Sequence, residues 1–327
     1  MSIPKAVLYY NSSSIWSSAA LIALEEKGYG KDDVDLKEVD LVKAENYAPS
    51  FLRLNSKATV PTLVVPLEKT LSEHVASRYK ALTDTKTIIE FLDKSRSHLS
   101  TTNSTSEAPM PALAPATVVL SSTYKRIVDE LLHSEDADPN NLLYVNARDN
   151  VSLRALGDAL SPVMKGKVDA LSHYISEAQA GNIRASEKVT SFWGAKKDAA
   201  QVLLEVYENA KVPESAQSAE YFTEYFKVAK ASWEVGLVRV LNQLNEEIIG
   251  PYALGEQYSL ADPHLTAWLT RVISLAGGTY NDTSAVAIEK LVKHIGVEQP
   301  LVLTKLAVYW DAVKERPSWK VYADGLH

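Results

Sequence analysis

Residues 59–65 have the sequence Thr-Val-Pro-Thr-Leu-Val-Val, a run of strand-forming residues interrupted by one proline. Proline cannot donate a hydrogen bond to a strand ladder, so Pro61 is expected at a strand's first residue, at an edge or at a bulge. If the Val60-Pro61 bond is cis, the backbone N–H and C=O of Val60 point out of the fold and can pair with an extended peptide. A trans proline that only begins a strand is the commoner alternative.

Residues 81–92 predict a short strand, a polar turn and a helix with apolar positions at Ile88, Ile89, Phe91 and Leu92. Asp84 and Thr85 therefore stand at a helix N-terminus, where free backbone N–H groups and the helix dipole attract an anion. The Asp84 carboxylate can hold an ammonium group beside that anion. The two sites fit the head of an α-amino acid, although an ordinary N-cap uses the same residue types.

The rest of the N-terminal region alternates strands and helices. The expected elements are a strand at 6–10, a turn at 11–14, a helix ending at Gly28, a strand at 34–41 and an irregular helix ending at Asn55. This order predicts an α/β thioredoxin-like domain over residues 1–95. In such a domain the proline that opens the third strand faces the N-terminus of the first helix.

The remainder of the chain is predicted to be helical. Residues 96–117 are rich in Ser, Thr, Pro and Ala and lack apolar periodicity, so they are expected to form a linker. Helical periodicity follows at 118–132, 153–175, 189–207 and 221–249. The sequence therefore predicts an all-α C-terminal domain over residues 118–327.

Composition excludes several classes of function. The chain has 327 residues, 46% of them hydrophobic, which is enough for two domains with their own cores. Its net charge of −7 gives no basic surface for nucleic acid. It has no cysteine, and its seven histidines lack metal-ligand spacing, so disulfides and a metal site are not expected. With neither a signal peptide nor a membrane span, a soluble cytoplasmic protein is expected.

Several short motifs resemble the glutathione-binding domain of the soluble glutathione transferases, in matching order and spacing. They are Leu8-Tyr9-Tyr10, Glu25-Glu26-Lys27-Gly28, Asn55 followed by Val60-Pro61-Thr62-Leu63, and Leu82-Thr83-Asp84-Thr85 before Ile88-Ile89. The resemblance implies that glutathione is the co-substrate. The Val60 backbone would pair with its cysteinyl part beside a cis Pro61, Asp84 and Thr85 would hold its γ-glutamyl head, and Arg53 or Lys57 would contact its glycyl carboxylate. Asn46 and Tyr47 also lie in that last stretch.

Two C-terminal motifs extend the resemblance. Residues 259–262, Ser-Leu-Ala-Asp, resemble the family's S-x-A-D box. As a capping box, the Ser259 hydroxyl would accept from the Asp262 N–H while the Asp262 carboxylate accepts from the Ser259 N–H. Residues 316–319, Arg-Pro-Ser-Trp, resemble the end of the family's last helix. The helical half is longer than usual for the family, and a helical insertion is expected at about 133–217. It can shape a pocket, extend a dimer interface or serve packing alone.

The catalytic group must lower the pKa of the glutathione thiol, because the thiolate is the nucleophile. Counting back from Gly28, Ser14 occupies the position that resembles the family's catalytic Ser or Cys, although Ile15 replaces the usual proline and neighbouring serines allow a shift in register. A tyrosine-type enzyme is the rival, since Tyr9-Tyr10-Asn11 also resembles that subclass. The serine type, with Ser14 as donor, is preferred over Tyr9. Trp16 and Tyr124 are candidates for lining the electrophile site.

The expected function is that of a glutathione transferase, a detoxifying homodimer that activates the thiol for attack on a small hydrophobic electrophile. The alternative is a non-catalytic transferase-like module that binds glutathione or a hydrophobic ligand. A third class, the cysteine-type members that reduce mixed disulfides, is excluded because the chain has no cysteine.

Overall fold

The computed structural model describes residues 5–66, 79–97, 111–212 and 218–322. The chain packs into two compact units, which are described separately. Unit 1 contains residues 1–38, 59–139 and 236–327, and unit 2 contains residues 39–58 and 140–235. These units follow contact density and not chain order, so the sequence-based boundaries at 95 and 118 remain a prediction. Most of the expected linker, residues 98–110, lies outside the described residues.

The four strands of unit 1 form one mixed sheet in the order β2-β1-β3-β4. They are β1 (Ala6–Tyr10), β2 (Val34–Glu38), β3 (Thr62–Pro66) and β4 (Tyr79–Leu82). Strand β1 pairs in parallel with β2 and antiparallel with β3, which pairs antiparallel with β4. Leu8 and Leu63, which face each other across β1 and β3, are completely buried. The sheet confirms the predicted thioredoxin-like fold.

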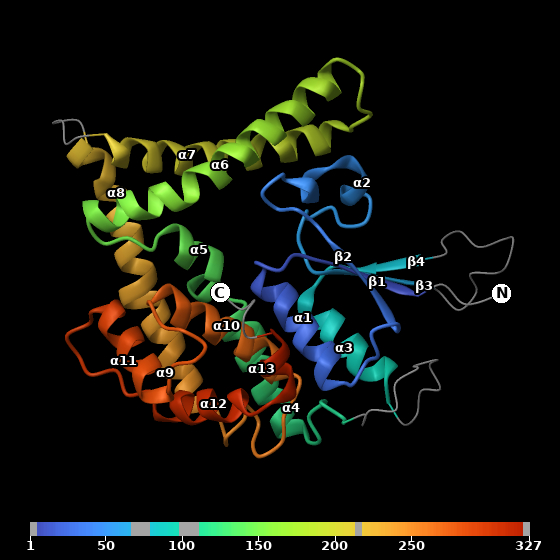
Figure 1. The fold of residues 1–327 in the computed structure, drawn as a ribbon, viewed down its shortest axis with the longest axis vertical. Coiled ribbons are helices and arrows are strands. Elements are labelled where there is room, and N and C mark those ends of the chain that lie inside the picture. Colours follow the sequence, from blue (N-terminus) through green and yellow to red (C-terminus); the bar gives the residue numbers. More distant parts are fainter. Residues whose placement is uncertain (1–4, 67–78, 98–110, 213–217, 323–327) are drawn as a thin grey trace, which may run out of the picture. The chain divides into compact units, whose positions relative to one another are not determined.

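Helix α1 (Ile15–Glu26) and helix α3 (Thr85–Ser95) pack against each other on one face of this sheet (Figure 1). Ten of the twelve residues of α1 are buried, including Ser17, Ser18 and several alanines. Small side chains let neighbouring elements approach the helix from more than one side. Helix α1 is therefore an internal element of unit 1.

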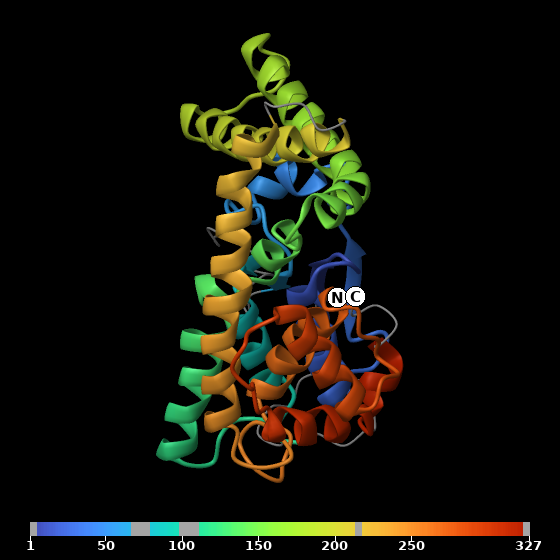
Figure 2. The ribbon, with the colours of Figure 1, turned by 90° about the vertical axis from the view of Figure 1, so that its left-hand side faces the viewer.

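The other helices of unit 1 confirm the largely helical C-terminal region. They are α4 (Val118–Lys125), the π-helix η2 (Arg126–Leu132), the short 3₁₀ turn η3 (Glu135–Ala137), α9 (Leu237–Glu247), α10 (Ala261–Leu275), α11 (Ser284–Ile295), α12 (Thr304–Lys314) and α13 (Pro317–Tyr322). Helices α9 to α13, drawn in orange to red in Figure 2, pack against one another in this unit. Helix α10 is buried along most of its length and packs against α1. Its Trp268 Nε1 donates to the carbonyl of Ala137 at 2.7 Å.

The box at the start of α10 forms, with one difference from the prediction. Asp262 accepts hydrogen bonds from the backbone N–H of Ser259 at 2.6 Å and of Ala253 at 2.8 Å. The Ser259 hydroxyl does not accept from the Asp262 N–H; it donates to the Asp262 carboxylate at 2.6 Å. The Asp262 N–H is instead bonded to the Ser259 carbonyl. One buried carboxylate thus collects three donors, which is a denser arrangement than a reciprocal capping box.

Unit 2 consists of the segment 39–58 and a set of long helices. The segment carries the 3₁₀ turn η1 (Glu45–Tyr47) and α2 (Pro49–Leu52), and the helices are α5 (Pro139–Tyr144), α6 (Asn150–Gln179), α7 (Glu187–Lys211), α8 (Ser218–Lys230) and the π-helical turn η4 (Ala231–Gly236). Helices α6 and α7 pair lengthwise as a hairpin (Figure 1). The region expected to form one helix at 221–249 is divided into α8, η4 and α9.

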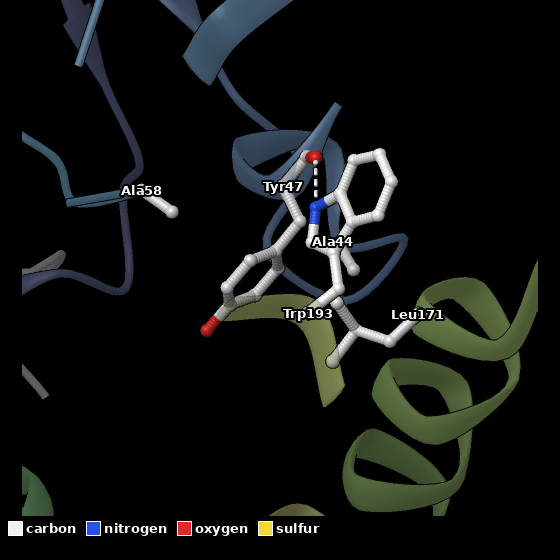
Figure 3. Close-up of a cluster of buried hydrophobic side chains, with 5 residues drawn as sticks. All are labelled: Ala44, Tyr47, Ala58, Leu171 and Trp193. Atoms are coloured by element: carbon white, nitrogen blue, oxygen red, sulfur yellow. Dashed lines mark hydrogen bonds between the residues drawn. The ribbon is translucent and has the colours of Figure 1, made fainter. Parts of the chain in front are cut away.

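A hydrophobic cluster joins this hairpin to the segment 39–58. Ala44, Tyr47 and Ala58 of the segment pack with Leu171 of α6 and Trp193 of α7 (Figure 3). The Trp193 ring is completely buried, and its Nε1 donates to the Tyr47 carbonyl at 3.0 Å. The hairpin therefore holds the segment by packing and by a buried hydrogen bond.

Asp262 provides a test of the packing around α10. Burial raises its pKa to about 6, against the hydrogen bonds from Ala253 and Ser259, which lower it. The folded protein thus binds this proton more tightly than the unfolded chain, so the contribution to stability falls as pH rises from about 4 to about 6. We expect wild type to lose on the order of 1–3 kcal/mol over this window relative to Asp262→Asn, measured by urea unfolding.

Ser259→Ala is the matched control, because it retains the carboxyl and removes one donor. Its loss over the same pH window should exceed that of wild type. A difference between wild type and Asp262→Asn that does not change with pH would contradict a raised pKa at Asp262.

Candidate glutathione site

The strand register brings three predicted site segments to one end of the sheet, where β1 and β4 end and β3 begins. Tyr9 near the end of β1 faces Thr62 at the start of β3, and Leu63 faces Leu82 at the end of β4. Three features of unit 1 therefore lie at this end of the strands. They are the turn that leads to Ser14, the Val60-Pro61 bond and Asp84. These are the residues for which the sequence predicted the thiol, the cysteinyl backbone and the γ-glutamyl head.

Ser14 is the N-cap residue of α1. Its backbone is extended, with φ −89° and ψ 114°, and its half-buried hydroxyl oxygen accepts from the Ser17 N–H at 3.3 Å. The helix has no acidic residue in its first turn, so its positive dipole end is not neutralised there. A hydroxyl that accepts with one lone pair keeps its O–H free to donate. The capping geometry and a thiolate-donating role are therefore compatible in one side chain.

The neighbouring serines are engaged in other ways. The Ser12 hydroxyl donates to Glu38 Oε1 at 3.0 Å, and the Ser17 hydroxyl oxygen accepts from the Asn11 N–H at 3.3 Å. The Ser18 hydroxyl donates to the Ser14 carbonyl at 3.3 Å. Ser14 is thus the serine that caps α1, and its catalytic role remains a prediction.

The rival tyrosines lie in β1. Tyr9 is half-buried, and the Lys37 ammonium lies 5.3 Å from its ring centre. Burial and the nearby Glu38 carboxylate raise the pKa of Tyr10. A less acidic phenol is a weaker hydrogen-bond donor to a thiolate. Tyr9 remains the alternative donor.

Val60 has the backbone geometry that the resemblance implies. The Val60-Pro61 bond is cis, and Val60 is almost completely buried. Among the described residues, no hydrogen bond to the Val60 N–H or C=O is present. The flanking Thr62 hydroxyl donates to the Thr59 carbonyl at 3.0 Å, which fixes the turn on either side. Buried backbone groups in folded proteins are nearly always paired. Val60 therefore offers one donor and one acceptor to a ligand.

Asp84 is the N-cap residue of α3, and Thr85 is buried behind it. Asp84 Oδ1 accepts from the Thr87 N–H at 3.0 Å and from the Thr87 hydroxyl at 3.1 Å. The side chain is exposed, and its second oxygen has no hydrogen bond in the described part of the chain. Capping thus occupies one oxygen of the carboxylate and leaves the other for an ammonium group.

The residues predicted to contact the glycyl carboxylate belong to unit 2. Arg53, just after α2, and Lys57 are both exposed. Asn46 donates from Nδ2 to the Ala58 carbonyl at 2.7 Å, and Tyr47 is buried in the cluster of Figure 3. Asn46 and Tyr47 therefore stabilise the segment, while Arg53 and Lys57 stay open to a ligand.

The two aromatic candidates have different environments. Tyr124 is buried, and its hydroxyl donates to Glu90 Oε1 at 3.1 Å, which places it in the packed interior. Burial, followed by the Glu90 charge, raises its pKa. Trp16, in the first turn of α1, is half-buried and stacks on His133 at 3.9 Å between ring centroids. Trp16 therefore remains available to line a second-substrate site.

Sequence reasoning missed Arg271. This residue of α10 donates from a guanidinium nitrogen to the Ser13 carbonyl at 2.7 Å, which brings a positive charge beside the start of α1. A cation next to a helix N-terminus favours a thiolate bound there. Its signal in the sequence was weak: a single arginine within a mostly buried helix. In the described residues, no cluster of His, Cys, Asp or Glu that could hold a metal ion is present. Nor is any described helix long and apolar enough to cross a membrane.

Residues 13–95 match the family model described as "Glutathione S-transferase, N-terminal domain". This stretch of the chain is therefore of the glutathione S-transferase N-terminal type. A curated relative, the tetrachloro-p-hydroquinone reductive dehalogenase of Sphingobium chlorophenolicum, is 47% identical over 64 residues, or 19% of this chain. The match covers 25% of that relative's length.

Solved glutathione transferases are similar at low identity. Gtt2 from Saccharomyces cerevisiae is 15% identical, with a TM-score of 0.46 over 97% of this chain and 99% of that one. Glutathione transferase F7 from Populus trichocarpa is 14% identical, with a TM-score of 0.46 over 98% and 99% of the two chains. A family member from Pseudomonas fluorescens, with two glutathione bound, is 13% identical, with a TM-score of 0.45 over 98% and 92%. The sheet order and the domain match over residues 13–95 show the thioredoxin-like fold.

The free oxygen of Asp84 leads to a prediction that separates capping from ligand binding. Asp84→Asn keeps an oxygen for the Thr87 N–H but loses the charge. We expect its affinity for glutathione to fall by roughly 1.5–3 kcal/mol, the range for a hydrogen bond to a charged group, as measured by calorimetry. Its stability should change little, because Asn and Asp are equivalent N-caps.

Asp84→Ala is the comparison variant. It should lose the same affinity and, in addition, about 0.5–2 kcal/mol of stability, because the cap is removed. If Asp84→Asn binds glutathione within about twofold of wild type, the carboxylate serves only as a cap.

Proposed function

We propose that the chain is a serine-type glutathione transferase that ionises the glutathione thiol for attack on a small hydrophobic electrophile. The observation that carries the proposal is the Val60 backbone, which is unpaired among the described residues and lies at the same end of the sheet as the N-termini of α1 and α3. An extended tripeptide is the ligand that uses a backbone donor, a backbone acceptor and two helix N-termini together. The domain match over residues 13–95 supports glutathione as that tripeptide.

In this proposal the peptide pairs with the Val60 backbone just before β3, at the end of the sheet and not along one of its outer strands. The Val60 N–H and C=O pair with the cysteinyl backbone, and the second Asp84 oxygen accepts from the γ-glutamyl ammonium. The γ-glutamyl carboxylate is held by the backbone N–H groups at the start of α3, next to Thr85. Arg53 and Lys57 contribute charge for the glycyl carboxylate.

The Ser14 hydroxyl then donates to the thiolate. A free thiol with a pKa near 8.5 is ionised to only a few per cent at neutral pH. One charge-assisted hydrogen bond of roughly 1.5–3 kcal/mol lowers that pKa by about 1–2 units. The dipole of α1 and the Arg271 guanidinium act in the same direction.

A second candidate is reductive dehalogenation, which the 47% identity of one 64-residue segment to a reductive dehalogenase favours. Replacement of an aromatic chlorine by hydrogen takes up two electrons. Because this chain has no cysteine, two glutathione molecules would supply them and leave as the disulfide, with chloride and a proton released. Release of glutathione disulfide together with chloride distinguishes this reaction from conjugation, which releases chloride alone.

The main proposal includes that the enzyme is a homodimer, acts in detoxification and is cytoplasmic. The remaining alternative is a non-catalytic module that binds glutathione or a hydrophobic ligand. Calorimetry with glutathione and turnover on a panel of aryl halides and unsaturated carbonyl compounds separates enzyme from module. Binding without turnover on any of them would establish the module. Sedimentation at micromolar concentration tests the dimer.

Ser14→Ala tests the catalytic assignment. Without the hydroxyl, the pKa of bound glutathione should rise by about 1–2 units in an ultraviolet titration of the thiolate. Turnover at neutral pH should fall by about tenfold or more, because less thiolate is present. Binding of glutathione should change much less than turnover.

Tyr9→Phe and Ser13→Ala are the matched controls, and both should leave the thiol pKa where it is in wild type. A raised thiol pKa in Tyr9→Phe together with an unchanged one in Ser14→Ala would transfer the role to the tyrosine.

A further inference from the structure

Two histidines form a hydrogen-bonded pair in unit 1. His133, which follows η2, lies with its Nε2 at 3.0 Å from Nδ1 of His264 in α10. His264 is completely buried, whereas His133 is exposed. The pair therefore connects the protein interior to the surface through one hydrogen bond.

The pair lies beside the predicted site. Trp16, two residues after Ser14, stacks on His133 at 3.9 Å with an angle of 21° between the rings. Among the charges that act on His133, the Asp84 carboxylate has the largest effect and raises the pKa of the ring. The histidine pair is thus next to the start of α1 and the N-cap of α3, the two ends at which glutathione is proposed to bind.

The buried end of the pair is Nε2 of His264. In the described residues, Nε2 of His264 makes no hydrogen bond. A neutral pair shares one proton between the rings and carries a second on an outer nitrogen. If that proton is on His264 Nε2, His133 Nδ1 is an acceptor; if it is on His133 Nδ1, that nitrogen is a donor. Either arrangement leaves His264 Nε2 unpaired among the described residues.

Charges around His133 favour brief uptake of a further proton. The His133 side chain is exposed at one side, but desolvation where the ring packs on Trp16 and His264 lowers its pKa; Asp84, Asp129 and Asp138 raise it and Lys86 lowers it. His264 is held neutral, because burial moves its pKa well below the ordinary value. A proton on His133 is also stabilised by its hydrogen bond to His264 and by the face of Trp16. His133 is therefore neutral at rest and suited to accept and release one proton.

We propose that His133 is a catalytic acid–base group of this transferase and selects α,β-unsaturated carbonyl electrophiles, an inference that rests on the proposed function. The glutathione S–H gives its proton to His133 Nδ1, directly or through water at the exposed ring. The thiolate forms a C–S bond to the β-carbon, and the C=C π pair moves so that negative charge reaches the carbonyl oxygen. The proton on His133 Nδ1 passes to that oxygen, which gives the enol and returns the pair to neutrality. His264 is a positioning residue.

This role predicts a difference between two electrophile classes. Addition to an enone produces an oxyanion that needs a proton, whereas displacement from an aryl halide releases a stable halide ion that does not. Loss of His133 should therefore slow addition much more than displacement. A histidine that only packs against Trp16 would affect both classes alike.

The experiment compares wild type, His133→Gln and His133→Phe, with His173→Gln as a control at an exposed histidine of α6. For each, kcat/KM is measured with an aliphatic enone and with 1-chloro-2,4-dinitrobenzene across a pH series. Both His133 variants should lose at least about tenfold with the enone and less than about threefold with the aryl halide. The enone profile should also lose the inflection that His133 produces below its ordinary pKa, and His173→Gln should match wild type.

Equal losses with both electrophiles, or no loss with either, would overturn the role of His133 while transferase activity on the aryl halide upholds the proposed function. Wild-type protein that binds glutathione but turns over neither electrophile would overturn both. Nitrogen-15 NMR of the imidazoles gives a readout without turnover: His133 should titrate below its ordinary pKa and His264 should stay neutral. A His133 signal that titrates at or above its ordinary pKa would contradict a ring that is neutral at rest, and with it the acid–base role.

Discussion

The burial of α1 between the sheet and α10 is the constraint on which unit 1 depends. A helix with ten of twelve residues buried cannot present a polar face, so its buried positions, apart from Glu26 at its end, are filled by alanine, serine and aliphatic side chains. Such a helix has polar groups to satisfy mainly at its ends, where backbone N–H and C=O groups lack partners within the helix. The structure places its buried polar contacts at those two ends.

At the C-terminal end, buried charges fix α1 to distant elements. The Lys27 ammonium bonds Asp93 of α3 at 2.8 Å, and both side chains are almost fully buried. Glu26 accepts from Arg316 and from the Ser318 hydroxyl, which anchors the start of α13. Loss of one partner would leave an uncompensated charge in the interior, so substitution of a single partner is expected to be strongly destabilising. They set the position of α1 along its axis.

At its N-terminal end, α1 leaves free backbone N–H groups near the end of the sheet. That helix end carries Ser14 and Trp16 and is contacted by Arg271. The Val60 backbone, unpaired among the described residues, and Asp84 lie at the same end of the sheet. A site formed in this way is held by buried elements and not by loops alone, so its donors are positioned before a ligand arrives. In unit 2, the α6–α7 hairpin gives comparable support to the segment that carries Arg53 and Lys57.

The sequence by itself determined the features that depend on adjacent residues. Apolar periodicity, proline and the turn residues set the succession of strands and helices along the N-terminal region and the helix starts at Ser14 and Asp84, because a cap is formed by atoms within three residues of it. The Ser259 hydroxyl was assigned the wrong direction, since a carboxylate buried by tertiary packing draws every nearby donor to itself. Only the tertiary structure decided the contacts between remote segments. His133 meets His264 across 131 positions, Trp193 meets Tyr47 across 146 and Arg271 meets Ser13 across 258. No local pattern specifies such pairs, because they result from how buried helices pack.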